Sequence, residues 1–522
     1  MVNTTQTLIT GATDGLGRAL ARLLQAQGER PFLLGRRALS DLDDPLFTPD
    51  NYIQADLSRP DCARRVLAFL AAQQVTRLDR LIHNAGMGYY GETAAQAPNS
   101  IDQLIDVNLL APIRLTQALL PHLKRARGQI SFVSSVVAIM PGPDYAVYTA
   151  TKAGLEGFAR SLRQELRGQV TVQIMRPGAT RTGMHAKMGL ETSVMDWQRF
   201  PPSEQVTPMM LRQIERGRPV VTVGLGNRLL YGLGYYAPGL VAWGLRRKRG
   251  NKTAVSTPST EENGAPLCAP LCAITGAADG IGRALALRYA QAGYTIIGID
   301  QDADRAAATA QAIGANGGEA HFILADLAQA DDRSRVVEQL AAYPPLTVLI
   351  HNAGINAVGH FAQLDLARQE AVLDINLRAP LQVTAALLRQ QQLAAAGRLV
   401  FISSLSRYVS YPGAAVYAAT KDGLAAYGRS LNVALPQSVL TVFPGPTRTA
   451  HARRYSPDNS REETRMTPEA LAEAIFQADS RRRSHLIPGR QNRLFAQLGH
   501  WWPGLMDGAM RKLILEKLPD GR

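Results

Sequence analysis

The chain has 522 residues, of which 46% are hydrophobic and 19% are charged, and this composition is that of a folded globular protein rather than a disordered one. The length exceeds what one hydrophobic core supports, so two domains of roughly 250 residues are expected. The formal charge of +14 would suit nucleic acid, an anionic membrane surface or a phosphorylated cofactor. No Lys- and Arg-rich helix with interleaved aromatic residues accompanies this charge, which disfavours nucleic acid.

The cysteines and the N-terminus favour a cytoplasmic protein. Cys62, Cys268 and Cys272 are too few for a secreted disulfide framework. Cys268 and Cys272 lie at the start of an expected buried strand, where packing is a better explanation than metal ligation, so no metal site is expected. The first six residues are mostly polar and lack the charged and apolar regions of a signal peptide.

The sequence repeats itself. Thr10–Leu20 recurs as Thr275–Leu285, and His83–Gly86 recurs as His351–Gly354. A polar segment, 251–266, separates the copies and is typical of a flexible linker. We therefore expect three parts, namely a first domain over residues 1–250, the linker, and a second domain over 267–522.

Short apolar runs alternate with longer helical patterns in each half. In the second half the runs are Cys272–Thr275, Thr295–Asp300, Phe322–Leu324, Val348–Ile350, Leu399–Ile402 and Leu440–Phe443. Continuous apolar strands that alternate with helices indicate a parallel sheet covered on both faces. The expected fold class is α/β, with two doubly wound parallel-sheet (Rossmann) domains in tandem.

A Thr-Gly-x-x-x-Gly-x-Gly pattern follows the first expected strand of each half and opens a helix. In this context glycines permit a tight turn and let backbone N–H groups at the helix N-terminus approach a pyrophosphate. The pattern therefore predicts dinucleotide binding in both halves. The expected contacts are Thr10, Gly11, Gly15, Leu16 and Gly17 in the first half, and Thr275, Gly276, Gly280, Ile281 and Gly282 in the second.

The two halves differ at the end of the second strand, where this fold discriminates the ribose 2′ position. Asp300 of the second half aligns with Gly35, and Gln301 aligns with Arg36. A carboxylate accepts hydrogen bonds from free ribose hydroxyls, whereas Arg36 can pair with a 2′-phosphate, with Arg37 as a second candidate for that contact. The expected cofactors are NADP in the first domain and NAD in the second. The alternative is that Arg36 and Arg37 are solvated loop cations and that Asp300 is a turn residue at the end of the strand.

A tyrosine and a lysine recur four residues apart on helix-forming sequence, as Tyr148 with Lys152 and as Tyr417 with Lys421. This spacing places both side chains on one helix face. A neighbouring ammonium stabilises a phenolate, which would let the tyrosine exchange a proton near neutral pH. Thirteen residues before each tyrosine stands a serine whose hydroxyl could bind the reacting oxygen. These serines are Ser135 and Ser404.

With these motifs in both halves, the chain resembles two ordinary, 250-residue short-chain dehydrogenases/reductases. The resemblance implies that Asn108 and Asn376 complete the catalytic groups, and that Lys152 and Lys421 also contact the nicotinamide ribose. An alternative role for both asparagines is local hydrogen bonding to the backbone. Further implied cofactor contacts are Asp56, Asn84, Ala85, Gly86, Pro177, Gly178 and Thr182 in the first half, and Asp326, Asn352, Ala353, Gly354, Pro444, Gly445 and Thr449 in the second.

His83 and His351 depart from the family, which more often has asparagine there. Each histidine follows an apolar strand, so a structural hydrogen bond is expected rather than catalysis.

Each half ends in a similar apolar tail. In the first half, Leu229–Leu245 is uncharged and is followed by four basic residues, Arg246–Arg249. Such a segment suits contact with a membrane surface, but it also suits helices that cap the substrate cleft or pack between the halves. A lipophilic alcohol or ketone is the expected small-molecule substrate. The variable loops that follow the Pro-Gly motifs, Met184–Pro202 and His451–Thr464, share little sequence.

The sequence thus predicts an NAD(P)-dependent oxidoreductase with two unlike active sites. The alternative is that one half is catalytic and the other is a non-catalytic cofactor-binding or pseudo-dimer module. Members of the resembling family usually pair through the helices that carry the catalytic Tyr and Asn. Partners are therefore expected to be a small-molecule substrate and either the chain's own second half or another copy of the chain, in the cytoplasm or on a membrane surface.

Overall fold

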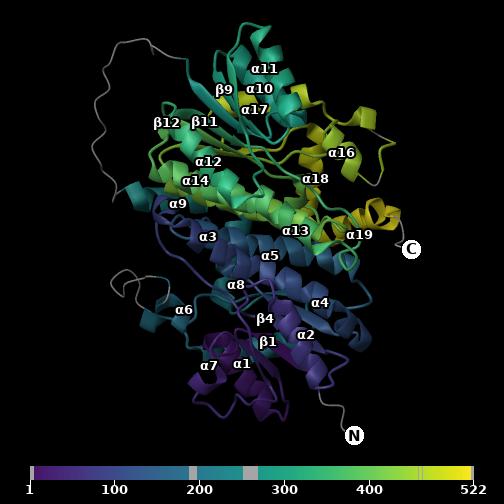
Figure 1. Cartoon of the computed structure of the whole chain (residues 1–522). Coiled ribbons are helices and arrows are strands. Elements are labelled where there is room, and N and C mark those ends of the chain that lie inside the picture. Colours follow the sequence, from purple (N-terminus) through teal and green to yellow (C-terminus); the bar gives the residue numbers. More distant parts are fainter. Residues whose placement is uncertain are drawn as a thin grey trace.

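The computed structural model describes residues 5–186, 188, 197–250, 269–456, 458–460 and 462–518. The expected linker and Cys268 lie outside the described residues. Two α/β units are stacked on each other, the first drawn in purple to teal-blue and the second in teal-green to yellow (Figure 1).

The first unit contains a seven-stranded parallel sheet of order β3-β2-β1-β4-β5-β6-β7. Its strands are β1 (Thr7–Thr10), β2 (Phe32–Gly35), β3 (Tyr52–Gln54), β4 (Arg80–His83), β5 (Gln129–Val133), β6 (Thr171–Arg176) and β7 (Val220–Thr222). Its main helices are α1 (Gly15–Ala26), α2 (Cys62–Ala72), α3 (Pro98–Ile105), α4 (Ala111–Ala126), α5 (Ala146–Glu165), α6 (Gly183–Ala186), α7 (Ser203–Glu215), α8 (Leu225–Tyr236) and α9 (Pro238–Gly250).

The second unit repeats this sheet in the order β10-β9-β8-β11-β12-β13-β14. Its strands are β8 (Leu271–Thr275), β9 (Thr295–Asp300), β10 (Ala320–Leu324), β11 (Leu346–His351), β12 (Leu393–Ile402), β13 (Ser438–Val442) and β14 (His485–Leu486). Its main helices are α10 (Gly280–Gln291), α11 (Ala303–Gly314), α12 (Ala330–Ala341), α13 (Leu366–Leu373), α14 (Ala379–Arg389), α15 (Ala415–Ala434), α16 (Ala450–Tyr455), α17 (Pro468–Ser480), α18 (Arg490–Trp501) and α19 (Pro503–Leu513).

Both sheets confirm the expected doubly wound fold. The central strands are buried along their whole length, as β1 and β8 illustrate, because helices cover both faces. In each sheet the strand order reverses beside the first strand, between β1 and β4 and between β8 and β11. A crevice for a ligand opens at the carboxyl ends of the strands at such a reversal. The predicted glycine loops follow β1 and β8 and therefore lie at these crevices.

Helices α5 and α15 pack against each other along the boundary between the two units. Glycines allow the close approach. A Cβ on Gly154 would lie 3.0 Å from the backbone oxygen of Ala419, and a Cβ on Gly423 would lie 3.0 Å from that of Ala150. These two contacts occupy corresponding positions of the repeat, so the halves meet with approximate twofold symmetry.

Hydrogen bonds at the same boundary follow the repeat. Ser161 Oγ accepts from the backbone N–H of Tyr411 at 3.1 Å, and Ser430 Oγ accepts from that of Gly142 at 3.2 Å. Apolar residues from both halves join in one continuous core, including Leu109, Leu155, Leu377 and Leu424. The two units therefore share a core instead of touching at a wet surface.

One continuous helical stretch, Leu366–Arg389, is long and apolar enough by composition to cross a membrane. Most of its apolar window, 67%, is buried inside the protein. This stretch forms α13 and α14 and is a core element of the second unit.

Glu165 provides a test of the boundary between the halves. Its carboxylate accepts hydrogen bonds from the backbone N–H groups of Phe361 at 2.9 Å and Gly413 at 2.8 Å. Burial nevertheless raises its pKa from the ordinary value of 4.5 to about 7. A carboxyl whose pKa is raised on folding stabilises the protein in its protonated form, so this contribution is lost as the pH rises from about 4.5 to 7.

We expect Glu165→Gln to melt at a lower temperature than the wild type at pH 5, because its amide NH2 cannot accept from the second backbone N–H, and we expect this difference to become smaller at pH 8, where the wild type loses the contribution of its protonated carboxyl. Differential scanning calorimetry of the full chain measures this, with the exposed Glu215→Gln as the control. An equal difference at both pH values would show that Glu165 does not titrate in this range.

Candidate active sites

The glycine loops have the geometry that a dinucleotide needs. Gly11 and Gly276 have φ values of 66° and 65°, in the left-handed region that favours glycine. A Cβ on Gly17 would lie 2.2 Å from the backbone oxygen of Gly11, so no larger residue fits at this turn. The loop thus leads directly into the N-terminus of α1, and its equivalent leads into α10, where backbone N–H groups would be available to a phosphate.

A threonine and an asparagine hold each loop in place. Thr10 Oγ1 accepts from the backbone N–H groups of Asn84 and Ala85, both at 3.0 Å. The Asn84 amide donates to the backbone oxygens of Thr10 and Gly11, both at 3.1 Å. Thr275 and Asn352 repeat the arrangement in the second half. Thr10 and Asn84 therefore serve as braces for the loop.

The groups expected to select the cofactor have different surroundings in the two halves. Asp300 lies at the end of β9 and accepts from the backbone N–H of Ala278 at 2.9 Å, which points its carboxylate at the glycine loop. Arg36 is exposed at the end of β2. The neighbouring Arg37 donates to the backbone oxygen of Asp41, so it folds back onto its own loop.

Asp56 and Asp326 lie after the third strand of each sheet. Each caps a turn through its Oδ1 atom, Asp56 by accepting from the Ser58 N–H at 2.9 Å and Asp326 by accepting from the Ala328 N–H at 3.0 Å. Both carboxylates thus have defined orientations, and Asp326 lines the same cavity as Gly276 and Gly280 of its glycine loop.

Ser135, Tyr148 and Lys152 come together at the start of α5. Tyr148 is hydrogen-bonded to Ser135. Lys152 lies with its Nζ 5.9 Å from the centre of the Tyr148 ring and donates to the backbone oxygen of Val133 at 3.0 Å. In the second half, Tyr417 is hydrogen-bonded to Ser404 and lies 5.6 Å from Lys421 Nζ by the same measure.

Burial controls the ionisation of both pairs. It raises the pKa of Tyr148 to about 12, against the lowering effect of the Ser135 hydrogen bond, and it raises the pKa of Tyr417 as well. It lowers the pKa of Lys152 and of Lys421 to about 8. The tyrosines are therefore protonated at neutral pH and can act as proton donors, while the lysines still carry most of their charge.

Asn108 and Asn376 are fully buried in π-helical turns, Asp106–Leu110 and Asp374–Arg378. Asn108 receives a hydrogen bond from the Met87 N–H at 2.7 Å and donates to the Met87 oxygen at 2.9 Å and to Thr151 Oγ1 at 3.0 Å. Asn376 makes the equivalent bonds. Local backbone bonding, the alternative role for these residues, is therefore present in both halves.

In the second half the predicted residues surround one cavity of about 1140 Å³. Its apolar wall includes Phe495, Met510, Leu513 and Ile514 from the C-terminal tail. Thr275, Gly282 and Asn376 are absent from its lining and support it from behind. The predicted residues that line it are Gly276, Gly280, Ile281, Asp300, Asp326, Asn352, Ala353, Gly354, Ser404, Tyr417, Lys421, Pro444, Gly445 and Thr449. A cleft of this volume, with a glycine loop at one end, fits a dinucleotide together with a substrate.

In the first half much of the variable loop Met184–Pro202 lies outside the described residues. The described residues around it keep the same relations. Thr182 lies against Gly15, where a Cβ on the glycine would be 2.8 Å from Thr182 Cγ2. Asn227 of α8 lies against Gly178, as Asn492 lies against Gly445. The two asparagines adjoin the Pro-Gly motifs, and they were visible in the sequence only as members of the repeated tails.

His83 and His351 have structural partners, as expected. Their Nε2 atoms lie 2.9 Å from Thr116 Oγ1 and 2.8 Å from Thr384 Oγ1. Burial lowers the pKa of both histidines to about 3, so they are neutral at physiological pH.

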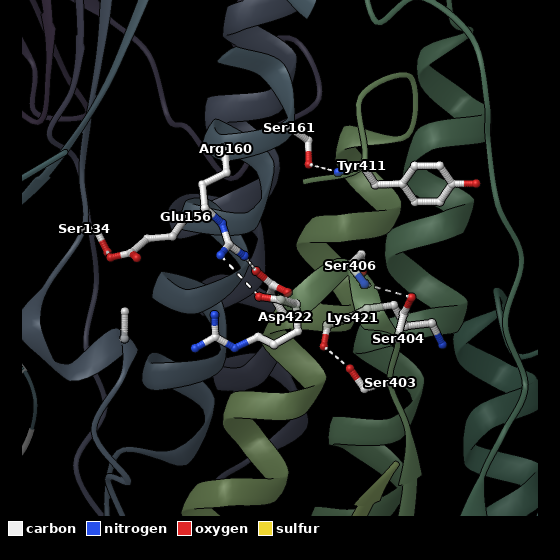
Figure 2. A network of polar contacts seen from close by, with 12 residues as sticks. Ser134, Glu156, Arg160, Ser161, Ser403, Ser404, Ser406, Tyr411, Lys421 and Asp422 are labelled. Carbon is white, nitrogen blue, oxygen red and sulfur yellow. Dashed lines mark hydrogen bonds and ion pairs between the residues drawn. The ribbon is translucent and has the colours of Figure 1, made fainter. Parts of the chain in front are cut away.

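A buried charge network that the sequence did not reveal lies behind the first site (Figure 2). Glu156 accepts from Ser134, the neighbour of Ser135, at 2.8 Å, and forms a two-pronged ion pair with Arg176 at 2.7 and 2.6 Å. Although burial raises the pKa of Glu156, Arg176 and Ser134 hold it below its ordinary value. The network ties the serine-bearing strand to the strand that precedes Pro177.

A second ion pair joins the two halves. Arg160 of α5 pairs with Asp422 of α15, the residue that follows Lys421, and it also donates to the backbone oxygen of Arg407 at 3.3 Å. Figure 2 shows Arg160 reaching across the boundary to Asp422. The position that corresponds to Asp422 in the first half is Ala153, so this pair occurs once.

The second half replaces Glu156 and Arg176 with Ala425 and Phe443. We expect Arg176→Phe alone to lower stability by ~3–5 kcal/mol, because it strands a buried carboxylate. The double change Glu156→Ala with Arg176→Phe copies the second half and should restore most of that loss. Urea unfolding of the full chain, followed by circular dichroism, compares the two. Equal destabilisation by both variants would mean that the charge on Glu156 is not the cause.

Comparison with known proteins places this geometry in a family. The family model for short chain dehydrogenases matches the chain twice, at residues 5–192 and 271–460. Nodulation protein G of Rhizobium sp. (strain N33) is 35% identical over 185 residues, which cover 35% of this chain and 75% of that protein. The 11-beta-hydroxysteroid dehydrogenase 1A of Arabidopsis thaliana is 32% identical over 183 residues, which cover 33% of this chain and 51% of that protein.

An N-terminal ketoreductase from the macrolactin assembly line resembles the whole chain in structure. It aligns with a TM-score of 0.61 and 12% identity, covering 95% of this chain and 89% of its own. At this identity the likeness shows a shared fold. The chain belongs to the short-chain dehydrogenase/reductase family. It is an NAD(P)-dependent oxidoreductase with two such units in tandem.

Proposed function

We propose that each half interconverts a secondary alcohol and a ketone on a lipophilic small molecule, the first with NADP and the second with NAD. One observation carries the proposal: in the second half, Ser404, Tyr417 and Lys421 line the same cavity as the glycine loop and Asp300. A hydride acceptor and a proton-transferring tyrosine would then meet at one substrate carbon and its oxygen.

The side chains of the chain divide the work at the reacting oxygen. The bound nicotinamide supplies or accepts the hydride. In ketone reduction, Tyr417 gives its phenolic proton to the oxygen while Ser404 donates a hydrogen bond to it. Lys421, whose ammonium faces the tyrosine ring, stabilises the phenolate that remains. In alcohol oxidation the same groups run in reverse, and Ser135, Tyr148 and Lys152 have these roles in the first half.

Asn108 and Asn376 are proposed to act through the backbone that they hold. Each fixes the segment after the Asn-Ala-Gly motif and bonds to the threonine one residue before the catalytic lysine. They would keep the cofactor-facing loop and the Tyr-Lys helix in register.

The apolar tail wall of the second cavity supports a lipophilic substrate. Phe495, Met510, Leu513 and Ile514 present hydrocarbon to the cavity, and such walls bind apolar ligands by removing surface from water. The hydroxysteroid dehydrogenase among the relatives is named for a substrate of this character. Bulky secondary alcohols and their ketones are the compounds to screen first.

Two conservative variants test whether both halves are catalytic. Tyr148→Phe and Tyr417→Phe each remove one phenolic hydroxyl and leave the ring. We expect each to abolish a different part of the activity in a panel of bulky secondary alcohols and ketones, with losses of at least ~10²-fold for the affected substrates. The double variant serves as the inactive control. If only one of the two changes ever reduces turnover, the other half is a non-catalytic module.

Charge changes at the second strand of each half test the cofactor assignment. We expect Arg36→Ala to weaken NADPH binding by ~10-fold or more and to leave NADH binding unchanged, because a 2′-phosphate loses its cation. Asp300→Asn should leave NADH bound more weakly and admit NADPH to the second site. Fluorescence titration of the full chain with each reduced cofactor measures both, with Arg37→Ala as the matched control. Equal effects on the two cofactors would contradict the assignment.

A further inference from the structure

The two C-terminal tails carry one apolar surface. Its members are large apolar or aromatic residues with exposed fractions of 50–69%, and we call them together the tail surface. They are Leu229, Leu233, Tyr236, Leu240 and Trp243 from α8 and α9, and Leu494, Trp501, Trp502 and Leu505 from α18 and α19. Exposed residues of this size and number, gathered on two short segments, mark an interaction site.

The tails meet, so the surface is one patch and not two. Tyr235 of α8 donates to the backbone oxygen of His500 of α18 at 3.1 Å, and their rings stack with centres 4.3 Å apart. Tyr236 stacks on Trp501 at 5.3 Å. From this contact α9 and α19 lead to opposite ends of the boundary between the halves, where α9 contacts α15 and α19 contacts α5 (Figure 1).

The patch is fixed to the rest of the protein. Arg176 lies with its guanidinium 4.0 Å from the centre of the Tyr231 ring, which attaches α8 to the charge network of the first site. Arg246 of α9 donates to the backbone oxygen of Asn432 in α15 at 3.0 Å. In α18, Gly499 lies directly against the backbone of Tyr408. A preorganised apolar face of this kind binds without first having to fold.

The positive charge of the two tails indicates what kind of partner the tail surface binds. Residues 225–250 and 490–517 contain ten Lys and Arg and two Asp and Glu, which gives these segments more than half of the net charge of +14. One of these cations, Arg247, lies 5.5 Å from the centre of the Trp243 ring. Tryptophan and tyrosine beside basic residues are typical of the interface between lipid headgroups and acyl chains.

We propose that the tail surface docks the folded enzyme on an anionic lipid bilayer. Trp243, Trp501 and Trp502 enter the headgroup region, and exposed basic residues beside them, such as Arg247, lie near the lipid phosphates. Pairing of this surface with a second copy of the chain would bring like charges together, whereas an anionic bilayer neutralises them.

The cavity of the second half opens beside the tail surface. Phe495 and Leu513 line the cavity and are also exposed, by 45% and 51% of their surface. A lipophilic substrate dissolved in the bilayer would therefore reach Tyr417 along an apolar path. This step rests on the proposed function, while the docking itself does not.

Vesicle flotation of the full chain tests the docking. We expect at least ~10-fold more protein to float with phosphatidylcholine vesicles that contain about 30% phosphatidylglycerol than with pure phosphatidylcholine, and we expect salt to reduce binding. Leu240→Ser, Trp243→Ser, Trp502→Ser and Leu505→Ser combined should lose at least ~10-fold of this binding. Leu324→Ser, which changes an exposed leucine of β10, is the matched control.

Tryptophan emission gives an independent measurement. Three of the four tryptophans lie in the tail surface, and the fourth is Trp197. Anionic vesicles should shift the emission to the blue, and brominated lipids should quench it, equally in the wild type and in Trp197→Phe. Emission that does not respond to vesicles would overturn the proposal.

Two further outcomes separate the alternatives. A dimer in sedimentation velocity that is lost in the tail variant, together with no vesicle binding, would make a second copy the occupant and overturn bilayer docking. Vesicle binding by a chain that turns over no alcohol or ketone would instead contradict the proposed function alone.

Discussion

The packing of α5 against α15 is the constraint on which the rest of the molecule depends. These helices carry both Tyr-Lys pairs, and they meet through Gly154 and Gly423 at backbone distance. Each helix is thus buried on one side by its own sheet and on the other by its counterpart. A helix that is packed on both sides cannot shift without disturbing the packing on both sides. The catalytic side chains at the start of each helix are therefore held in fixed positions.

The repeat preserves the reacting groups and varies their surroundings. The Ser, Tyr, Lys and Asn residues make the same contacts in both halves. The buried charges behind the serine-bearing strand occur in the first half and are replaced in the second. Glu156 and Arg176 fill with a paired charge the space that Ala425 and Phe443 fill with hydrocarbon. Both residue pairs are tolerated at these positions because neither leaves a buried polar group without a partner. The ion pair satisfies its own charges and hydrogen bonds, and the apolar pair has no polar side-chain group.

Local features were predictable from the sequence. The glycine loops were predictable because the positive φ of Gly11 and the close approach at Gly17 depend on a few adjacent residues. The shared helix face of Tyr148 and Lys152 was predictable because helix geometry alone fixes it. The parallel sheets followed from apolar runs that alternate with helices. Contacts across the fold were not predictable. Arg160 and Asp422 are far apart in the chain, and only the packing of α5 on α15 brings them together. The tails were ambiguous for a physical reason: Phe495 both lines the cavity and faces outward, so one apolar pattern serves two surfaces.

The ion pair of Arg160 with Asp422 has a consequence for how such a chain can change. In a homodimer one mutation changes both subunits. An aspartate introduced at the symmetric interface therefore appears twice, and the interface must accommodate it at both positions. In a fused chain the aspartate is introduced once, and the partner helix can adapt independently. Covalent linkage also keeps the halves at a high effective concentration, so their pairing does not weaken on dilution. Fusion therefore allows the sequences of the two halves to diverge at their interface, while the covalent link keeps the halves paired.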